Sequence, residues 1–159
     1  MPDPVDRRME LVLWRHAEPE DALRDAERPL SPRGLRQAAR VAAWLEQRLP
    51  AKYAVYASPV RSARQTAEAL GVEPLVSERL GPGATASDVL ELVDWPNRRG
   101  TVAIVVGHQP TLGRVAAQLV TGSSVDLSIR KGGLWWIARR DREGKTSVIV
   151  RAVVSPDFL

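Results

Sequence analysis

The feature that most constrains this chain is the alternation of short apolar segments with amphipathic ones along most of its length. The clearest apolar segment, Thr101–Val106, is rich in β-branched residues, which is typical of a strand buried on both faces of a parallel sheet. The run Leu11–Trp14 predicts a second buried strand. Because helical periodicity separates such runs, we expect βαβ units and an α/β fold: a single doubly wound, mostly parallel sheet flanked by helices.

Turn and cap residues set the predicted boundaries. Ser31-Pro32 begins a helix that stops at Pro50, and Ser58-Pro59 begins another that stops at Gly71. Two further helices are predicted, one capped by Ser87 and running to Val93, the other spanning Leu112–Val120. The remaining predicted strands are Tyr53–Ala57, Leu75–Val76 and a closing pair, Leu134–Ala138 and Val148–Val154, joined by the polar turn Asp141–Lys145. The closing pair is a candidate antiparallel edge, and residues 17–30 are predicted to be a loop.

Length and composition narrow the function classes. The 159 residues suit one domain, 1–159, and no apolar run approaches the roughly 18 residues that span a bilayer. The polar start lacks the apolar core of a signal peptide, so we expect a cytoplasmic protein with no membrane partner. There is no cysteine, which excludes disulfides and thiol nucleophiles. With only His16 and His108 as histidines, a three-histidine zinc site is excluded, and we predict no metal and no cofactor.

The charge balance favours anionic partners. The net charge is +4, with acids interleaved among the basic residues, as in the segment RRDREGK. Only 5% of residues are aromatic, and no basic-aromatic platform for stacking bases is evident. Nucleic-acid binding through net charge is therefore the least favoured function, and phosphate compounds are the favoured partners.

Both histidines fall at the carboxyl end of a predicted strand. His16 follows the first strand, beside Arg15, and His108 follows the strongest one. A third strand leads into Ser58–Arg64, which carries two arginines at a predicted helix start. In an open α/β sheet such strand ends meet at the ligand-binding edge. Guanidiniums and a helix N-terminus bind phosphate oxygens, and neighbouring guanidiniums keep an imidazole neutral and nucleophilic.

Four sequence blocks resemble the motifs of the histidine phosphatase superfamily, the phosphoglycerate mutase-like proteins. They occur in the family's order and are Leu11–Glu18 (Arg-His signature), Leu30–Ala38 (Leu-Ser-x-x-Gly-x-x-Gln-Ala), Ala57–Ala67 (Ser-Pro to Gln-Thr-Ala) and Val106–Gly113 (second His). The short chain leaves no room for a lid insertion, and Gln109-Pro110 follows the second histidine. Both features are similar to the SixA-type phosphohistidine phosphatases.

The resemblance implies a mechanism and a set of site residues. His16 would attack phosphorus and carry a transient phosphohistidine. Arg15, His108 as a cation, and Arg61 would hold the phosphoryl oxygens. The other substrate-binding candidates are Gln109, Arg64 and Glu18.

The chain departs from the family pattern at two positions. The glycine after the first histidine is Ala17, for which we expect little effect. The phosphate-binding arginine is replaced by Ser62, between Arg61 and Arg64. We favour Arg61 as the substitute, because it lies at the predicted helix start; the alternatives are Arg64, or two solvated arginines.

The sequence is compatible with three functions, which differ in substrate or in turnover. None of the acids Glu18, Glu20, Asp21 and Glu78 matches the family's general acid firmly. A phosphoramidate needs no strong enzyme acid, since its leaving imidazole is protonated by solvent, so phosphohistidine on a phosphotransfer domain or phosphocarrier protein is favoured. The alternatives are a phosphatase for small phosphate esters and a phosphate- or phosphoprotein-binding module without turnover. The oligomeric state is left open.

Overall fold

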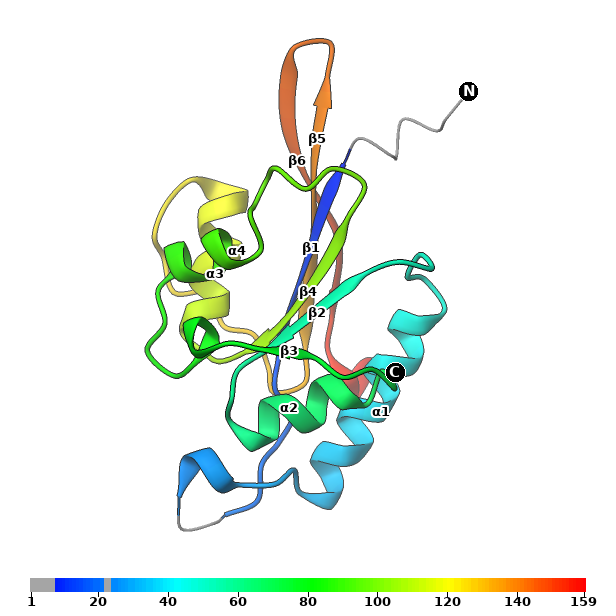
Figure 1. Ribbon diagram of the computed structural model, residues 1–159, viewed down its shortest axis with the longest axis vertical. Helices are drawn as coiled ribbons and strands as arrows, with labels where there is room; N and C mark the ends of the chain where they lie inside the picture. Colours follow the sequence, from blue (N-terminus) through cyan, green and yellow to red (C-terminus); the bar gives the residue numbers. More distant parts are fainter. Residues whose placement is uncertain (1–7, 22–23) are drawn as a thin grey trace.

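The computed structural model describes residues 8–21 and 24–159, which form one mixed six-stranded sheet with helices on both faces (Figure 1). The strand order is β3-β2-β4-β1-β5-β6. The strands are β1 (Met9–Arg15), β2 (Ala54–Ala57), β3 (Leu75–Val76), β4 (Val102–Gly107), β5 (Leu134–Arg142) and β6 (Lys145–Val154). The first four run parallel, whereas β5 pairs antiparallel with β1 and β6 with β5. The predicted α/β sheet and its antiparallel edge are confirmed; the polar start, residues 1–7, and residues 22–23 of the predicted loop lie outside the described residues.

The helices divide between the two faces, which makes the sheet doubly wound. α1 (Pro32–Glu46) and α2 (Arg61–Glu68) cover one face, and α3 (Ala86–Leu92) and α4 (Thr111–Thr121) cover the other (Figure 1). Alternate residues of β4 enter two separate cores: Ile104 packs towards α1 and α2, and Val105 towards α3 and α4. Short 3₁₀ turns lie at Asp25–Glu27, Glu78–Leu80 and Pro156–Phe158. Among the described helices, none is both long enough and apolar enough to cross a membrane.

The β5–β6 hairpin extends further than the sequence pattern predicted. The two strands continue to Arg142 and Lys145, and only Glu143 and Gly144 form the turn, both with positive φ (52° and 74°). The Thr146 hydroxyl donates a hydrogen bond to Asp141 across the strands at 2.7 Å. Both faces of this tip are exposed and polar, so the hydrophobic alternation that marks a strand is missing there.

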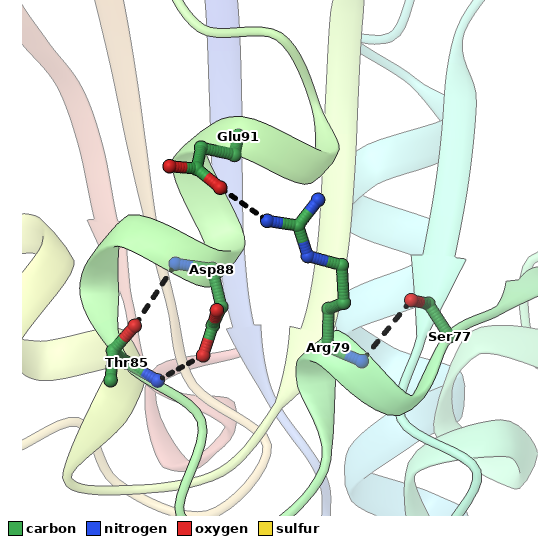
Figure 2. Close-up of polar contacts among 5 residues, drawn as sticks. All are labelled: Ser77, Arg79, Thr85, Asp88 and Glu91. Atoms are coloured by element: carbon green, nitrogen blue, oxygen red, sulfur yellow. Dashed lines mark hydrogen bonds and ion pairs between the residues drawn. The ribbon is translucent and has the colours of Figure 1, made fainter.

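The prediction that Ser87 caps the third helix was wrong, because Thr85 is the N-cap. The Thr85 hydroxyl accepts a hydrogen bond from the Asp88 N–H at 3.1 Å, and the Asp88 carboxylate accepts from the Thr85 N–H at 2.9 Å (Figure 2). This reciprocal pair is a capping box. Arg79 joins the same helix through an ion pair with Glu91, while the Ser77 hydroxyl accepts from the Arg79 N–H at 3.2 Å. The contacts fix the connection between β3 and α3.

Candidate active site

Three parallel strands bring the candidate residues to one edge of the sheet. Arg15 pairs with Gly107 at the ends of β1 and β4, and Ala57 of β2 pairs with Val106 of β4. The residues that follow these strands therefore converge: the two histidine rings lie with their centroids 5.0 Å apart, tilted by 57°. Both rings are half-buried. The two imidazoles therefore meet at this edge of the sheet, as the strand pattern predicted.

The backbone around His16 is held from two sides. The His16 N–H donates to the Gly107 carbonyl at 3.1 Å, and the Ala17 N–H donates to the Thr66 hydroxyl at 3.0 Å. Thr66 in turn donates to the Ser62 carbonyl at 2.8 Å within α2. Ala17 is fully buried, so this turn is packed rather than free. His16 is therefore presented by a turn tied to both β4 and α2.

One hydrogen bond selects the tautomer of His16. Its Nδ1 lies 2.8 Å from the Ala17 carbonyl oxygen. Because a carbonyl only accepts, Nδ1 must carry the proton, which leaves Nε2 with a free lone pair when the ring is neutral. The geometry thus produces an imidazole whose Nε2 is ready for nucleophilic attack.

The electrostatic environment keeps both rings neutral in the free protein. Burial lowers the pKa of His16; the hydrogen bond to Ala17 opposes this, and the charges of Arg15 and Lys131 add to the lowering. Burial, His16 and Arg15 together lower the pKa of His108 to about 4. A neutral ring is what a role of His16 as nucleophile would require. For His108 to hold phosphoryl oxygens as a cation, as the resemblance implies, an arriving phosphoryl dianion would have to raise its pKa.

Titration of the two histidines is expected to show both shifts directly. Because only two imidazoles are present, their C2 proton resonances can be followed by NMR without overlap, and a His108→Asn variant assigns them. We expect both midpoints below 6.5, with His108 near 4. Inorganic phosphate should raise the His108 midpoint. Two midpoints at or above 6.5 would contradict this electrostatic account.

These shifts also predict a loss of stability in acid. The unfolded chain takes up a proton on each histidine near pH 6.5, whereas folded His108 resists protonation until about pH 4. Between these values the unfolded state binds more protons, so the free energy of unfolding falls as the pH is lowered. The Tm of the wild type is expected to fall more than that of His108→Asn between pH 7 and 5. Equal slopes for the two proteins would show that His108 does not contribute.

Ser58 is a site residue that the sequence interpretation missed. It was predicted to cap the second helix, but α2 begins at Arg61 with Val60 as its N-cap. Ser58 is fully buried, and its hydroxyl accepts a hydrogen bond from the Val60 N–H at 3.2 Å and lies 2.8 Å from Nε2 of His108. It therefore positions the second imidazole. The signal for this role was the Ser-Pro that follows a strand at the site edge.

Replacing Ser58 with alanine is expected to lower kcat/KM about tenfold, the effect of losing one orienting hydrogen bond. The NMR titration of His108 should shift in the same variant, which a purely structural role would not produce. Ser62→Ala is the matched control, because Ser62 is also buried in this segment but has no hydrogen bond to either histidine. Equal losses in the two variants would remove Ser58 from the site.

Arg15 is oriented by its own contact. Its Nη1 donates to the Ile129 carbonyl at 2.8 Å, which ties the guanidinium to the segment before β5. Its Nε is buried and makes no hydrogen bond to another described residue. A buried donor without a partner costs about 1–3 kcal/mol, which an anion accepting from it would recover.

The structure does not bring every candidate residue to the imidazoles. Arg61 and Arg64 are both exposed on α2, while Ser62 between them is buried. Arg61 is the first residue of α2, three positions after Ser58, and Arg64 lies one turn further along the helix. Neither guanidinium has a hydrogen bond or ion pair within the described residues.

Gln109 and Glu18 are engaged with the protein itself. The Gln109 amide donates to the Leu127 carbonyl and accepts from the Gly113 N–H, each at 2.8 Å, so it secures the start of α4. The Glu18 carboxylate accepts from the Ser31 hydroxyl at 2.8 Å and lies 4.0 Å from Arg33. Gln109 thus has a structural role that the sequence did not reveal, and Glu18 faces a hollow beside the crevice.

This hollow has a volume of about 420 Å³ and is lined in part by Arg15, which ends β1 beside His16. Its walls come from α1, the segment before β5 and the C-terminal turn, and its lining residues are Arg15, Glu18, Arg33, Arg36, Gln37, Arg40, Arg130, Lys131, Pro156 and Asp157. Among the described residues there is no group of three or more side chains suited to hold a metal ion. The local chemistry is therefore cationic and arginine-rich.

Comparisons with known proteins agree with this geometry. A model of the histidine phosphatase superfamily (branch 1) matches residues 11–81. An uncharacterised protein of Mycobacterium tuberculosis is 37% identical over 111 residues, 69% of this chain and 70% of that protein. A structure assigned as the phosphohistidine phosphatase SixA of Nakamurella multipartitia is 29% identical, with a TM-score of 0.76, covering 94% of this chain and 96% of that one. The protein histidine phosphatase SixA complexed with tungstate shares the fold at 23% identity, with a TM-score of 0.78 and coverage of 94% and 99%.

Proposed function

This chain belongs to the histidine phosphatase superfamily, and from that premise we propose that it hydrolyses phosphohistidine on a partner protein. The observation that carries the proposal is the hydrogen bond from Nδ1 of His16 to the Ala17 carbonyl, which leaves Nε2 unprotonated beside a second imidazole. The more general conclusion is that this chain is a phosphatase similar to the SixA proteins. The proposal adds three finer points. The substrate is phosphohistidine, the protein acts in cytoplasmic signal transduction, and the site residues have the roles described below.

The reaction is a double displacement. Nε2 of His16 attacks phosphorus, and the bond from phosphorus to the substrate imidazole breaks with its electron pair leaving on nitrogen, which takes a proton from solvent. A water molecule then attacks the phosphohistidine formed at His16. Phosphate leaves, and the neutral imidazole is restored.

The stabilising groups act on the charge that spreads over the phosphoryl oxygens in the transition state. Arg15 supplies a fixed cation, and Arg61 is the second guanidinium from the start of α2. His108 is neutral before binding, but the phosphoryl dianion favours its protonated form. Ring protonation then allows one N–H to bond the Ser58 hydroxyl and the other to bond a phosphoryl oxygen. The two histidines would therefore have different roles, His16 as the nucleophile and His108 as a cation that binds a phosphoryl oxygen.

The acids around the crevice favour a phosphoramidate over an alkyl ester. Within the described residues, no carboxylate forms a hydrogen bond or ion pair with either imidazole. Glu18, the acid nearest in sequence to His16, is engaged with Ser31 and Arg33. An alkoxide leaving group needs an enzyme acid, but an imidazole leaving group is protonated by water.

The test is a comparison of two substrate classes. A panel of histidine-phosphorylated phosphotransfer and phosphocarrier proteins and p-nitrophenyl phosphate are each incubated with the protein, and phosphate release is followed. We expect kcat/KM for at least one phosphoprotein to exceed that for the ester by two orders of magnitude or more. Faster ester turnover would instead identify a small-molecule phosphatase, and tight vanadate binding without turnover a binding module.

The two arginines of α2 are expected to contribute unequally. Arg61→Gln should lower kcat/KM by about 10²-fold, because it removes a charge from the transition state, whereas Arg64→Gln should change it less than threefold. The matched substitutions differ only in their position along the same helix, where both side chains are exposed. A larger loss for Arg64→Gln would reverse the assignment, and no loss in either would leave both as surface residues.

A further inference from the structure

The net positive charge of this chain gathers beside the site, although acidic and basic residues are interleaved along the sequence. The hollow described above, here called the arginine hollow, is lined by six basic residues and two acidic ones. This excess of four equals the net charge of the whole 159-residue chain. The rest of the chain therefore has no net charge, and the net positive charge that attracts an anionic partner is that of this hollow.

The basic side chains of the arginine hollow are available to a partner. Arg33, Arg36 and Arg40 are exposed along one stretch of α1 and span about 10 Å of helix. Arg130 and Lys131, also exposed, approach from the segment before β5. Apart from the 4.0 Å contact between Arg33 and Glu18, none of these five side chains forms an ion pair within the described residues. Cations from two distant segments thus face one space, in which the acidic lining residues are Glu18 and Asp157.

The hollow is joined to the reaction centre. Arg15 lines it and directly precedes His16, while Lys131, on its other wall, contributes to lowering the pKa of His16. A partner held there lies next to the phosphoryl group that His16 attacks. The hollow is lined mainly by charged groups, whereas sites for small molecules are mostly apolar. An extended protein surface fits it better than a small metabolite does.

We propose that the arginine hollow docks an acidic segment of the phosphoprotein substrate, with carboxylates spaced along α1 and the phosphohistidine directed to His16. This inference rests on the proposed function and adds the chemistry of the partner. Carboxylates pair with guanidiniums in forked geometry, and several such pairs at the rim of an interface raise the association rate and make it sensitive to salt. Selectivity among phosphoproteins then depends on acidic residues around the modified histidine.

The test uses two peptides that each carry one phosphohistidine. In the first, glutamates flank it on both sides; in the second, glutamines replace them. The readout is the ratio of kcat/KM for the acidic peptide to that for the neutral one, so a change in overall activity does not enter. The ratio is measured for the wild type, for R36Q/R40Q, and for R142Q/K145Q. The control removes the same charge from the hairpin tip, at the opposite end of the sheet from the site (Figure 1).

We expect a ratio of about ten for the wild type at low salt, falling towards one at high salt. It should drop below about three in R36Q/R40Q and stay near ten in R142Q/K145Q. A ratio near one in the wild type, or one unchanged in R36Q/R40Q, overturns the docking proposal while hydrolysis of both peptides still supports the phosphatase.

If neither peptide is hydrolysed, the proposed function fails and docking is judged by binding. The anisotropy of a fluorescently labelled, unphosphorylated acidic peptide is then measured with the same three proteins. Binding that weakens in R36Q/R40Q alone supports the docking surface, and no binding, or equal binding to all three, overturns it. Hydrolysis of inorganic tripolyphosphate that is lost in R36Q/R40Q also overturns it, since the hollow would then hold a small polyanion.

Discussion

Replacing His16 with alanine is expected to lower kcat by about 10⁴-fold or more and to leave the fold intact. The loss is this large because no other group in the described site is placed to accept the phosphoryl group in its stead: His108 engages Ser58, and Arg15 cannot act as a nucleophile. The fold survives because the turn is held by its backbone, through the N–H groups of His16 and Ala17, and the imidazole itself is only half-buried.

A labelling experiment separates the nucleophile from its neighbours. The protein is mixed with a substrate carrying a labelled phosphoryl group and quenched in alkaline denaturant, which preserves phosphohistidine. Label should remain on the wild-type chain, be absent from His16→Ala, and accumulate slowly in His108→Asn, whose nucleophile is intact. Label on the His16→Ala chain would transfer the nucleophilic role to another residue, and a Tm lowered by more than a few degrees would reveal unfolding instead.

The fold and the meeting of the two histidines were accessible from sequence because both depend on local patterns. The β-branched run that became β4 is buried on both faces, so its apolar character is continuous. Parallel strands end at one edge, and that rule alone brought His16 and His108 together. The hairpin tip and the start of α3 were misplaced because exposed strands and competing cap residues leave weak or ambiguous signals.

The rest of the site depends on contacts between distant segments, which periodicity does not encode. The Ser58 hydroxyl forms a hydrogen bond with His108, which lies 50 positions later in the chain, and the Gln109 amide donates a hydrogen bond to the Leu127 carbonyl. The low pKa of His108 follows from its burial, which only the packed structure reveals. The arginine hollow is lined by residues of α1 and by residues nearly a hundred positions later in the chain. Its basic side chains are therefore far apart in the sequence but close together in the folded protein.

Gly34→Ala is expected to destabilise the protein by about 3 kcal/mol, although alanine usually favours a helix. In an unobstructed helix the change would stabilise by up to about 1 kcal/mol. Here a Cβ on Gly34 would lie 2.0 Å from the carbonyl oxygen of Glu18, which also accepts a hydrogen bond from the Ser31 N–H at 2.9 Å. Both partners are backbone, so no rotamer change relieves the overlap, and α1 must move away from the loop that follows His16.

The sign of the change in unfolding free energy tests whether α1 packs directly against the backbone of Glu18. For a chain of this size, the expected loss corresponds to a fall in Tm of roughly 6–12 °C, measured by circular dichroism and compared with urea unfolding. Gly107→Ala is the matched control, because its Cβ would meet the Leu112 side chain at 3.6 Å and the Leu80 carbonyl oxygen at 3.7 Å, both ordinary contacts. Since α1 carries three arginines of the hollow, displacement of the helix should also reduce the preference for the acidic peptide. A raised Tm in Gly34→Ala would mean that α1 does not approach Glu18, and the wall of the hollow would have to be redrawn.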